Sequence, residues 1–140
     1  MRFSASVLLA SLVAMASAAP VSPVENALEK RADWCGSSTF INNSSGGSPQ
    51  IADCQQLAAN IVGDGRWSVG YADKLIAKYG TCSFNARISA GFERSTYIGN
   101  EDLRDLIRDS IARFAWQGKV GASGVTDCNK ATVTWGIFHS

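Results

Sequence analysis

Hydrophobic positions recur at helical spacing in two segments of the chain. The first lies between Pro49 and Gly63, and its apolar positions share one face: Ile51, Cys54, Leu57 and Ile61. Ser48 followed by Pro49 is typical of a helix start, and Gly63 is typical of a helix end. This pattern predicts an amphipathic helix with its apolar side toward a core.

The second helical segment follows Gly99-Asn100 and ends before Gly118. Glu101 and Asp102 occupy its first turn, where the positive end of the helix dipole favours acids. Its predicted buried stripe is Leu103, Leu106, Ile107, Ser110, Ile111 and Phe114. The carboxylates Asp102, Asp105 and Asp109 all have an arginine nearby, and the spacing pairs Glu101/Arg104, Asp105/Arg108 and Asp109/Arg113. We therefore interpret them as a solvated, ion-paired face rather than as an acid and base pair.

Alternating apolar positions predict strands elsewhere. Short extended pieces are expected at 66–69 and 81–89, and two longer strands at about 120–128 and 131–138. Cys128-Asn129-Lys130 fits a hairpin turn between the last two. The stretch 71–80 fits a two-turn helix or a strand, and 36–49 is rich enough in turn residues to predict a surface loop. These elements predict an α+β domain, in which a mostly antiparallel sheet of four to five strands carries both helices on one face.

The N-terminal pattern predicts processing. Residues 1–18 have an early cation and a short apolar run, which is typical of a secretory signal peptide. Residues 19–31 contain two prolines and end in Lys30-Arg31, which predicts a propeptide with a dibasic processing site. The alternative is an uncleaved basic tail.

After cleavage the domain would comprise residues 32–140, begin at Ala32 and carry ten acidic and ten basic residues. Such a neutral domain has no charge pattern for nucleic acid, and no later segment is apolar enough for a membrane span.

Four cysteines, an even number, predict two disulfides in an oxidising compartment. Three pairings are open. We favour Cys35–Cys128, which would join the N-terminal edge to the closing hairpin, together with Cys54–Cys82, which would join the first helix to the inward face of a strand.

Two overlapping sequons lie in the predicted loop, at Asn42 and Asn43. Adjacent asparagines compete for space, so we expect at most one glycan.

Sequence motifs that would indicate a catalytic site are weak. The segment 120–125, VGASGV, resembles a hydrolase elbow but has Val125 where the motif needs glycine, and the one histidine, His139, is next to last. Asp53, Asp64, Glu93 and Asp127 cannot be assigned to a glycosidase pair from the sequence. Four tryptophans, Trp34, Trp67, Trp116 and Trp135, could form a carbohydrate-binding platform or fill the core. In a domain this small we favour the core, with Trp116 the most exposed of the four. We therefore expect no catalytic site, no metal and no cofactor.

Six blocks occur in order along the chain: WCGSSTF, SPQIADCQQLAANIVGDGRW, YGTCSF, IGNEDLRDLIRDSIARF, GKVGASGVTDC and WGIF. Together they resemble the necrosis-inducing factor family of secreted fungal pathogen effectors, the homologues of extracellular protein two. The resemblance covers about Asp33 to Phe138 and includes all four cysteines.

This resemblance implies a small secreted virulence factor without enzymatic activity that acts on the host and provokes plant cell death or defence. Its expected partner is an unknown host protein or receptor. The protein is expected to act in the host apoplast and to be a monomer. The family is also compared with a fungal killer toxin of α/β-sandwich fold that acts on ion channels. The alternative implied function is therefore an antimicrobial toxin directed at the channels or membranes of competing fungi.

Overall fold

Antiparallel strands and two helices make up residues 34–140, the part of the chain that this computed structural model describes. The predicted signal peptide and the Lys30-Arg31 site lie outside the described residues. The helices are α3 (Ile51–Asn60) and α4 (Asn100–Phe114). The strands are β1 (Cys35–Ser38), β2 (Ile41–Asn42), β3 (Arg66–Val69), β4 (Lys74–Tyr79), β5 (Cys82–Gly91), β6 (Thr96–Gly99), β7 (Ala122–Cys128) and β8 (Ala131–His139).

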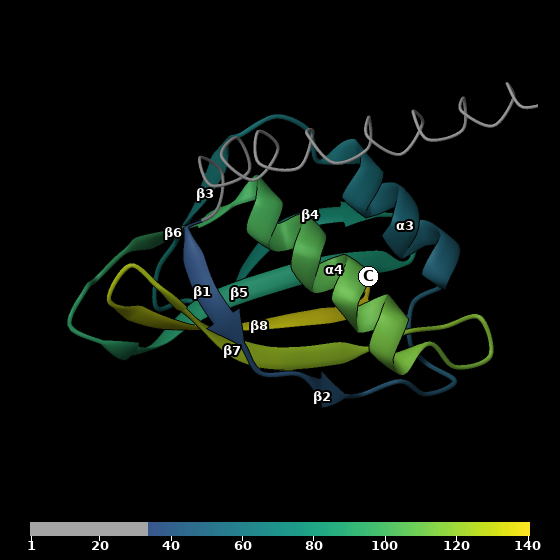
Figure 1. Cartoon of the computed structure of the whole chain (residues 1–140). Helices are drawn as coiled ribbons and strands as arrows, with labels where there is room; N and C mark the ends of the chain where they lie inside the picture. Colours follow the sequence, from purple (N-terminus) through teal and green to yellow (C-terminus); the bar gives the residue numbers. More distant parts are fainter. Residues whose placement is uncertain (1–33) are drawn as a thin grey trace, which may run out of the picture. The chain divides into compact units, whose positions relative to one another are not determined.

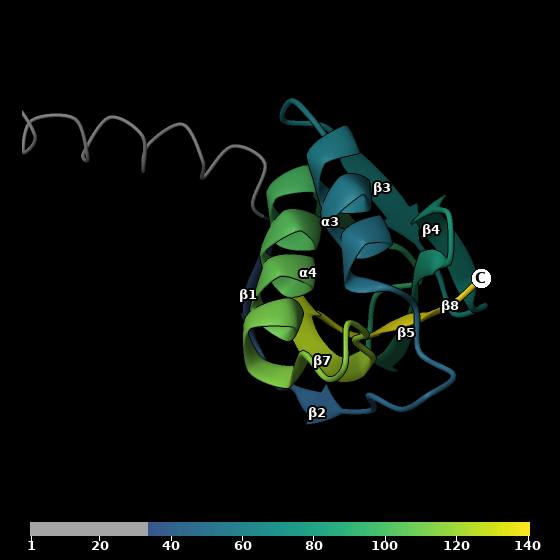
Figure 2. The same ribbon diagram turned by 90° about the vertical axis from the view of Figure 1, so that its right-hand side faces the viewer.

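Every strand pair is antiparallel. Five strands form a sheet in the order β1-β7-β8-β5-β4, to which β2 adds a short pairing with β7, while β3 and β6 form a separate two-stranded sheet. Figure 1 shows α3 and α4 crossing the same side of the larger sheet, and Figure 2 shows the two helices side by side. The α+β class is therefore confirmed, but the described chain has eight strands instead of four to five.

The core lies between the sheet and the helices. The inward residues of β5 and β8 are buried, and they face the predicted stripe of α4. Phe84 and Trp135 stack at 5.8 Å between ring centroids, and Phe40 meets the edge of Trp135 at 5.5 Å. Trp116 is 45% exposed, the most exposed of the four tryptophans as predicted, since Trp135 is buried and Trp34 and Trp67 are half-buried.

Several local predictions were wrong in their boundaries. Helix α3 begins at Ile51 with Gln50 as its cap, because the Ser48 hydroxyl accepts the N–H of Ser45 within the preceding loop. Helix α4 ends at Phe114, three residues before the predicted end. The open choice at 71–80 is settled as strand β4.

The β7–β8 hairpin follows its sequence closely. Asn129 and Lys130 both have positive φ, at 53° and 74°, which is the geometry of a two-residue hairpin turn that matches the twist of its strands.

The predicted surface loop 36–49 contains strands β1 and β2. They join the sheet through β7, and the link between them crosses very close to Gly124. A Cβ at that position would lie 2.0 Å from the carbonyl oxygen of Thr39, so only glycine fits there.

Asp53 ties α3 to the turn between β4 and β5. Its Oδ2 accepts the Thr81 N–H at 2.9 Å and the Thr81 hydroxyl at 2.7 Å. These bonds, the backbone one foremost, hold the pKa of Asp53 below its ordinary value of 3.8, with a smaller contribution from His139. Gly80 is required beside it, since a Cβ there would lie 2.6 Å from Asp53 Oδ2.

We predict that Asp53→Asn lowers stability in a pH-dependent way. A depressed pKa in the folded state stabilises the protein above the unfolded pKa, and this stabilisation is lost as pH falls through the folded pKa. The urea midpoint of the variant should therefore lie below that of the wild type at about pH 7, and the gap should close toward about pH 2. Asp64→Asn, at an exposed carboxylate, serves as the control. A gap of the same size at both pH values would contradict this role.

Candidate functional site

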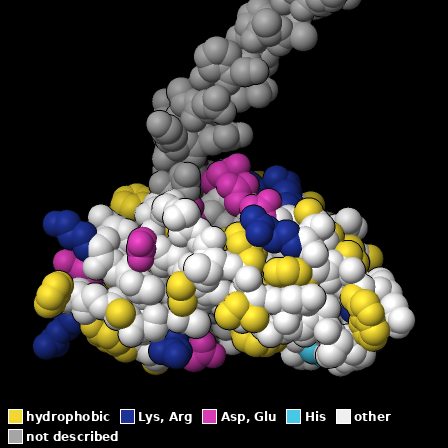
Figure 3. Space-filling model, turned by 60° about the horizontal axis from the view of Figure 1, so that its bottom comes forward, with side chains coloured by type: hydrophobic (Ala, Val, Ile, Leu, Met, Phe, Trp, Pro, Cys, Tyr) yellow, Lys and Arg dark blue, Asp and Glu magenta, His cyan; other side chains and the backbone are white. Residues whose placement is uncertain are grey.

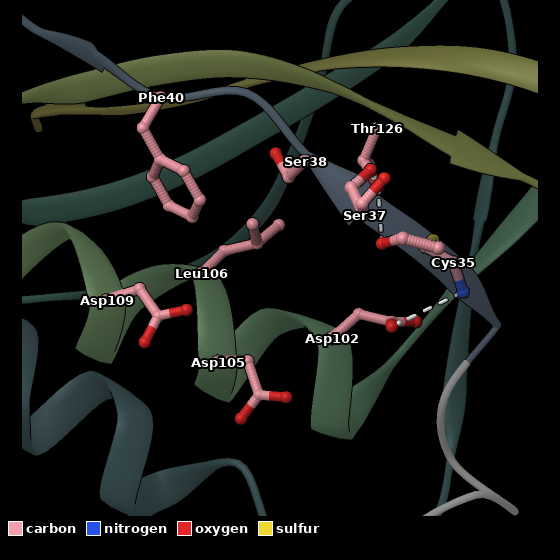
Figure 4. A pocket seen from close by; sticks show the side chains of 10 residues that line it. Cys35, Ser37, Ser38, Phe40, Asp102, Asp105, Leu106, Asp109 and Thr126 are labelled. Atoms are coloured by element: carbon pink, nitrogen blue, oxygen red, sulfur yellow. Dashed lines mark hydrogen bonds between the residues drawn. The ribbon is translucent and has the colours of Figure 1, made fainter.

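A cleft separates strand β1 from helix α4. It has a volume of about 290 Å³ and opens to solvent. One side is β1 and the residues that follow it, and the other is α4, with β7 at the floor (Figure 4). We call it the β1–α4 cleft; its lining residues are Cys35, Gly36, Ser37, Ser38, Phe40, Asp102, Asp105, Leu106, Asp109 and Thr126.

Asp102 closes one end of the cleft. Its carboxylate is buried, and it accepts the backbone N–H groups of Gly99 at 2.8 Å, Trp34 at 2.8 Å and Cys35 at 3.3 Å. The bond to Gly99 caps α4, where the helix dipole also favours a negative charge. The prediction of a solvated Asp102 was therefore wrong, because this side chain joins β1 to the first turn of α4.

Covalent and polar bonds fix the other side of β1 to β7. Cys35 and Cys128 face each other across the two strands and form a disulfide. The Thr126 hydroxyl lies 3.1 Å from the Gly36 carbonyl oxygen and 3.0 Å from that of Ser37. The Thr96 hydroxyl, in β6, donates to the Cys128 carbonyl at 2.7 Å and so holds the β7 end of this disulfide. The β1 wall of the cleft is thus held by its backbone as well as by its cysteine.

Asp105 and Asp109 are exposed along the α4 side of the cleft (Figure 4). The predicted ion pair between Glu101 and Arg104 forms. Arg113, expected to pair with Asp109, instead places its guanidinium 4.2 Å from the centroid of the Phe40 ring. On the face drawn in Figure 3, acidic and basic side chains lie near one another at several places around the outline, and hydrophobic side chains are scattered between them.

Residues 34–128 match the family Hce2, described as "Pathogen effector; putative necrosis-inducing factor". This range includes both cysteines of each disulfide and every residue that lines the β1–α4 cleft. The chain belongs to the Hce2 family. The resemblance seen in the sequence blocks is confirmed.

Two relatives of this Hce2 protein come from Penicillium expansum. Probable chitinase LysM18 is 31% identical over 130 residues, which cover 88% of this chain and 9% of that protein. Secreted chitinase LysM12 is 32% identical over 112 residues, which cover 72% of this chain and 7% of that protein. The chain therefore spans less than a tenth of the length of either relative.

The disulfides of this Hce2 domain are Cys35–Cys128 and Cys54–Cys82, the pairing favoured from the sequence. Cys54 and Cys82 are fully buried between α3 and β5, whereas Cys35 is half-buried at the cleft. The second disulfide thus belongs to the core and only the first borders the cleft.

The rejected chemical motifs lie away from the cleft. Ser123 is on β7 and accepts the side-chain amide of Asn43, while His139 ends β8 and contacts the backbone of Ser140. Across the described part of the chain, His, Cys, Asp and Glu side chains nowhere gather in a group of three that could hold a metal ion. Within residues 34–140, neither helix has the length and apolar character needed to cross a bilayer.

The two sequons differ in their surroundings. Both asparagines are exposed, and the Oδ1 of Asn42 accepts the N–H of Ser44, while its side-chain nitrogen has no hydrogen-bond partner among the described residues. The side-chain nitrogen of Asn43 instead donates to the Ser123 hydroxyl at 2.8 Å. A glycan on Asn43 would have to share this space with β7.

We predict a single N-glycan, at Asn42. In Asn42→Gln the mass loss on enzymatic deglycosylation should disappear, whereas Asn43→Gln should keep it, because the sequon that begins at Asn42 survives that change. Intact-mass measurement of the secreted protein before and after deglycosylation checks this. Two glycans on the wild type, or a glycan lost only in Asn43→Gln, would show that the prediction is wrong.

Proposed function

We propose that this protein is a secreted effector that binds a host plant protein or receptor and so induces cell death or defence, without catalysing a reaction. The single observation that carries the proposal is the Hce2 match, since it spans the disulfides and the whole β1–α4 cleft. Two disulfides and a relative named as secreted support an extracellular site of action. The expected signal peptide and cleavage after Arg31 would deliver a protein that begins at Ala32.

The chemistry of the cleft supports binding rather than catalysis. A glycosidase needs two carboxylates on opposite sides of the scissile bond, one of them able to give a proton. All three carboxylates here come from one helix, and that of Asp102 is occupied by backbone N–H donors. The open cleft instead offers charge on α4 and an aromatic ring, Phe40, on the facing segment. Such a mixture suits recognition of a partner surface.

A second function is favoured by the names of the relatives. Chitinases hydrolyse chitin, a polymer of fungal cell walls, and two proteins named chitinase contain a segment related to this chain. An enzyme that hydrolyses chitin meets fungal walls, and a segment carried on the same chain would meet the same cells. The alternative is therefore a killer-toxin-like antimicrobial protein that acts on the ion channels or membranes of competing fungi. Because the chain covers under a tenth of those proteins, we do not propose chitinase activity for it.

We predict that the purified secreted protein causes cell death or defence responses when infiltrated into leaves of its host and leaves the growth of yeasts unchanged. The double variant Asp105→Asn/Asp109→Asn, which removes two charges from the cleft, should need a dose about tenfold higher for the same leaf response, a loss of about 1.4 kcal/mol in binding. Ion leakage from leaf discs over a dilution series measures the response.

The matched control is Asp64→Asn/Asp127→Asn, which removes two exposed charges outside the cleft. Circular dichroism establishes that all variants are folded. Growth inhibition of yeasts without a leaf response would overturn the effector proposal in favour of the antimicrobial one. Equal leaf responses from the cleft variant and the wild type would contradict a role for the cleft.

A further inference from the structure

Strand β4 is one of the two edges of the larger sheet, and β1 is the other. In the order β1-β7-β8-β5-β4 its partner is β5, and the other side of β4 has no neighbouring strand. Within residues 34–140, no backbone group of β4 bonds to any element except β5. An exposed row of N–H and C=O groups is a ready template for another strand.

A hollow of about 320 Å³ lies directly beside this edge, on the helix side of the sheet. Its apolar lining comes from three elements that surround the edge: Leu57, Ile61, Val62, Trp67 and Ile76. Val62 stands on the rim, 72% exposed, although it is a large apolar residue. Ile76, in β4 itself, shows that the hollow and the strand edge form one surface.

Hydrogen bonds hold the hollow in shape. The indole N–H of Trp67 donates to the side-chain oxygen of Asn100 at 2.8 Å. The side-chain amide of Asn100 in turn donates to the carbonyl of Val62 at 2.9 Å. The ring and the rim are thus fixed through one buried asparagine at the start of α4, so the hollow exists before any partner arrives.

The charges of β4 select the occupant. Lys74 and Lys78 flank Ile76 in this strand. The register between β4 and β5 shifts at Ile76, between Leu75 and Ala77. Two antiparallel copies of β4 centred on this residue would bring Lys74 of one copy near Lys78 of the other, and like charges facing each other are destabilising. The same lysines favour a strand that carries acidic side chains. Lys78 is exposed, while Lys74 is held by bonds from its Nζ to the carbonyl and the hydroxyl of Ser68.

We infer that the open edge of β4 binds an extended acidic segment of a partner protein, which adds a strand to the sheet and places an apolar side chain in the adjacent hollow. In this mode of recognition, backbone hydrogen bonds supply affinity and the pocket supplies specificity. The inference rests on the proposed function, because it names the kind of host segment that such an effector would bind.

Two synthetic peptides of about eight residues test this inference. One alternates glutamate with valine, and the other alternates lysine with valine. Titrated into the ¹⁵N-labelled secreted protein, the acidic peptide should shift and protect the backbone amides of Lys74–Tyr79, with an affinity about tenfold higher than that of the basic peptide. Lys78→Glu should reverse this preference. Lys130→Glu, at the exposed β7–β8 turn, makes the same charge change elsewhere and should have no effect.

Three results would overturn the inference. The first is equal affinity for the two peptides, and the second is a response confined to amides outside β4. The third is a dimer in sedimentation experiments that dissociates when β4 is changed, which would make a second copy of the chain the occupant.

The titration involves no leaf tissue, so a protein that binds the acidic peptide but causes no leaf response contradicts only the proposed function. A leaf response from a protein whose β4 amides do not respond contradicts only this inference.

Discussion

The carboxylate of Asp102 accepts three backbone N–H groups from two segments that are distant in the sequence, the start of β1 and the start of α4. It caps α4 through Gly99 and holds the start of β1 through Trp34 and Cys35. A buried N–H without an acceptor costs about 1 to 3 kcal/mol, so each of these groups depends on the same side chain. The Cys35–Cys128 disulfide then continues the connection from β1 to β7. The β1–α4 cleft exists because β1 is held on both sides.

Much of the fold could be predicted from local patterns. The stripe of α4, the alternation in β5 and β8, and the Asn129-Lys130 turn each obey a short-range rule, and burial and backbone geometry confirm them. The Cys54–Cys82 disulfide also agrees with the sequence, because Cys54 lies on the apolar face of α3 and Cys82 lies on the inward face of β5.

The cleft itself could not be predicted. The residues of β1 are small and polar, and they form a strand only because β7 supplies hydrogen-bond partners and Cys128 a covalent one. Asp102 resembled its neighbours Asp105 and Asp109 in sequence, but it is the third residue after the Gly99 cap, the position from which an acidic side chain reaches back to the cap N–H. This spacing from Gly99 was the one signal in the sequence that could have distinguished Asp102 from Asp105 and Asp109. The open edge of β4 likewise depends on strand order, which no local pattern specifies.

The domain thus presents two surfaces on one disulfide-bonded framework, the β1–α4 cleft and the edge of β4, and the first of them depends on Asp102. Amide hydrogen exchange in Asp102→Asn tests this dependence most directly, with the exposed Asp109→Asn as its control. The amide has one acceptor oxygen, and its NH₂ would face a backbone donor. The amides of Trp34, Cys35 and Gly99 should therefore exchange much faster than in the wild type, and the unfolding free energy should fall by about 2 kcal/mol. Unchanged exchange at these three amides would contradict the role of Asp102.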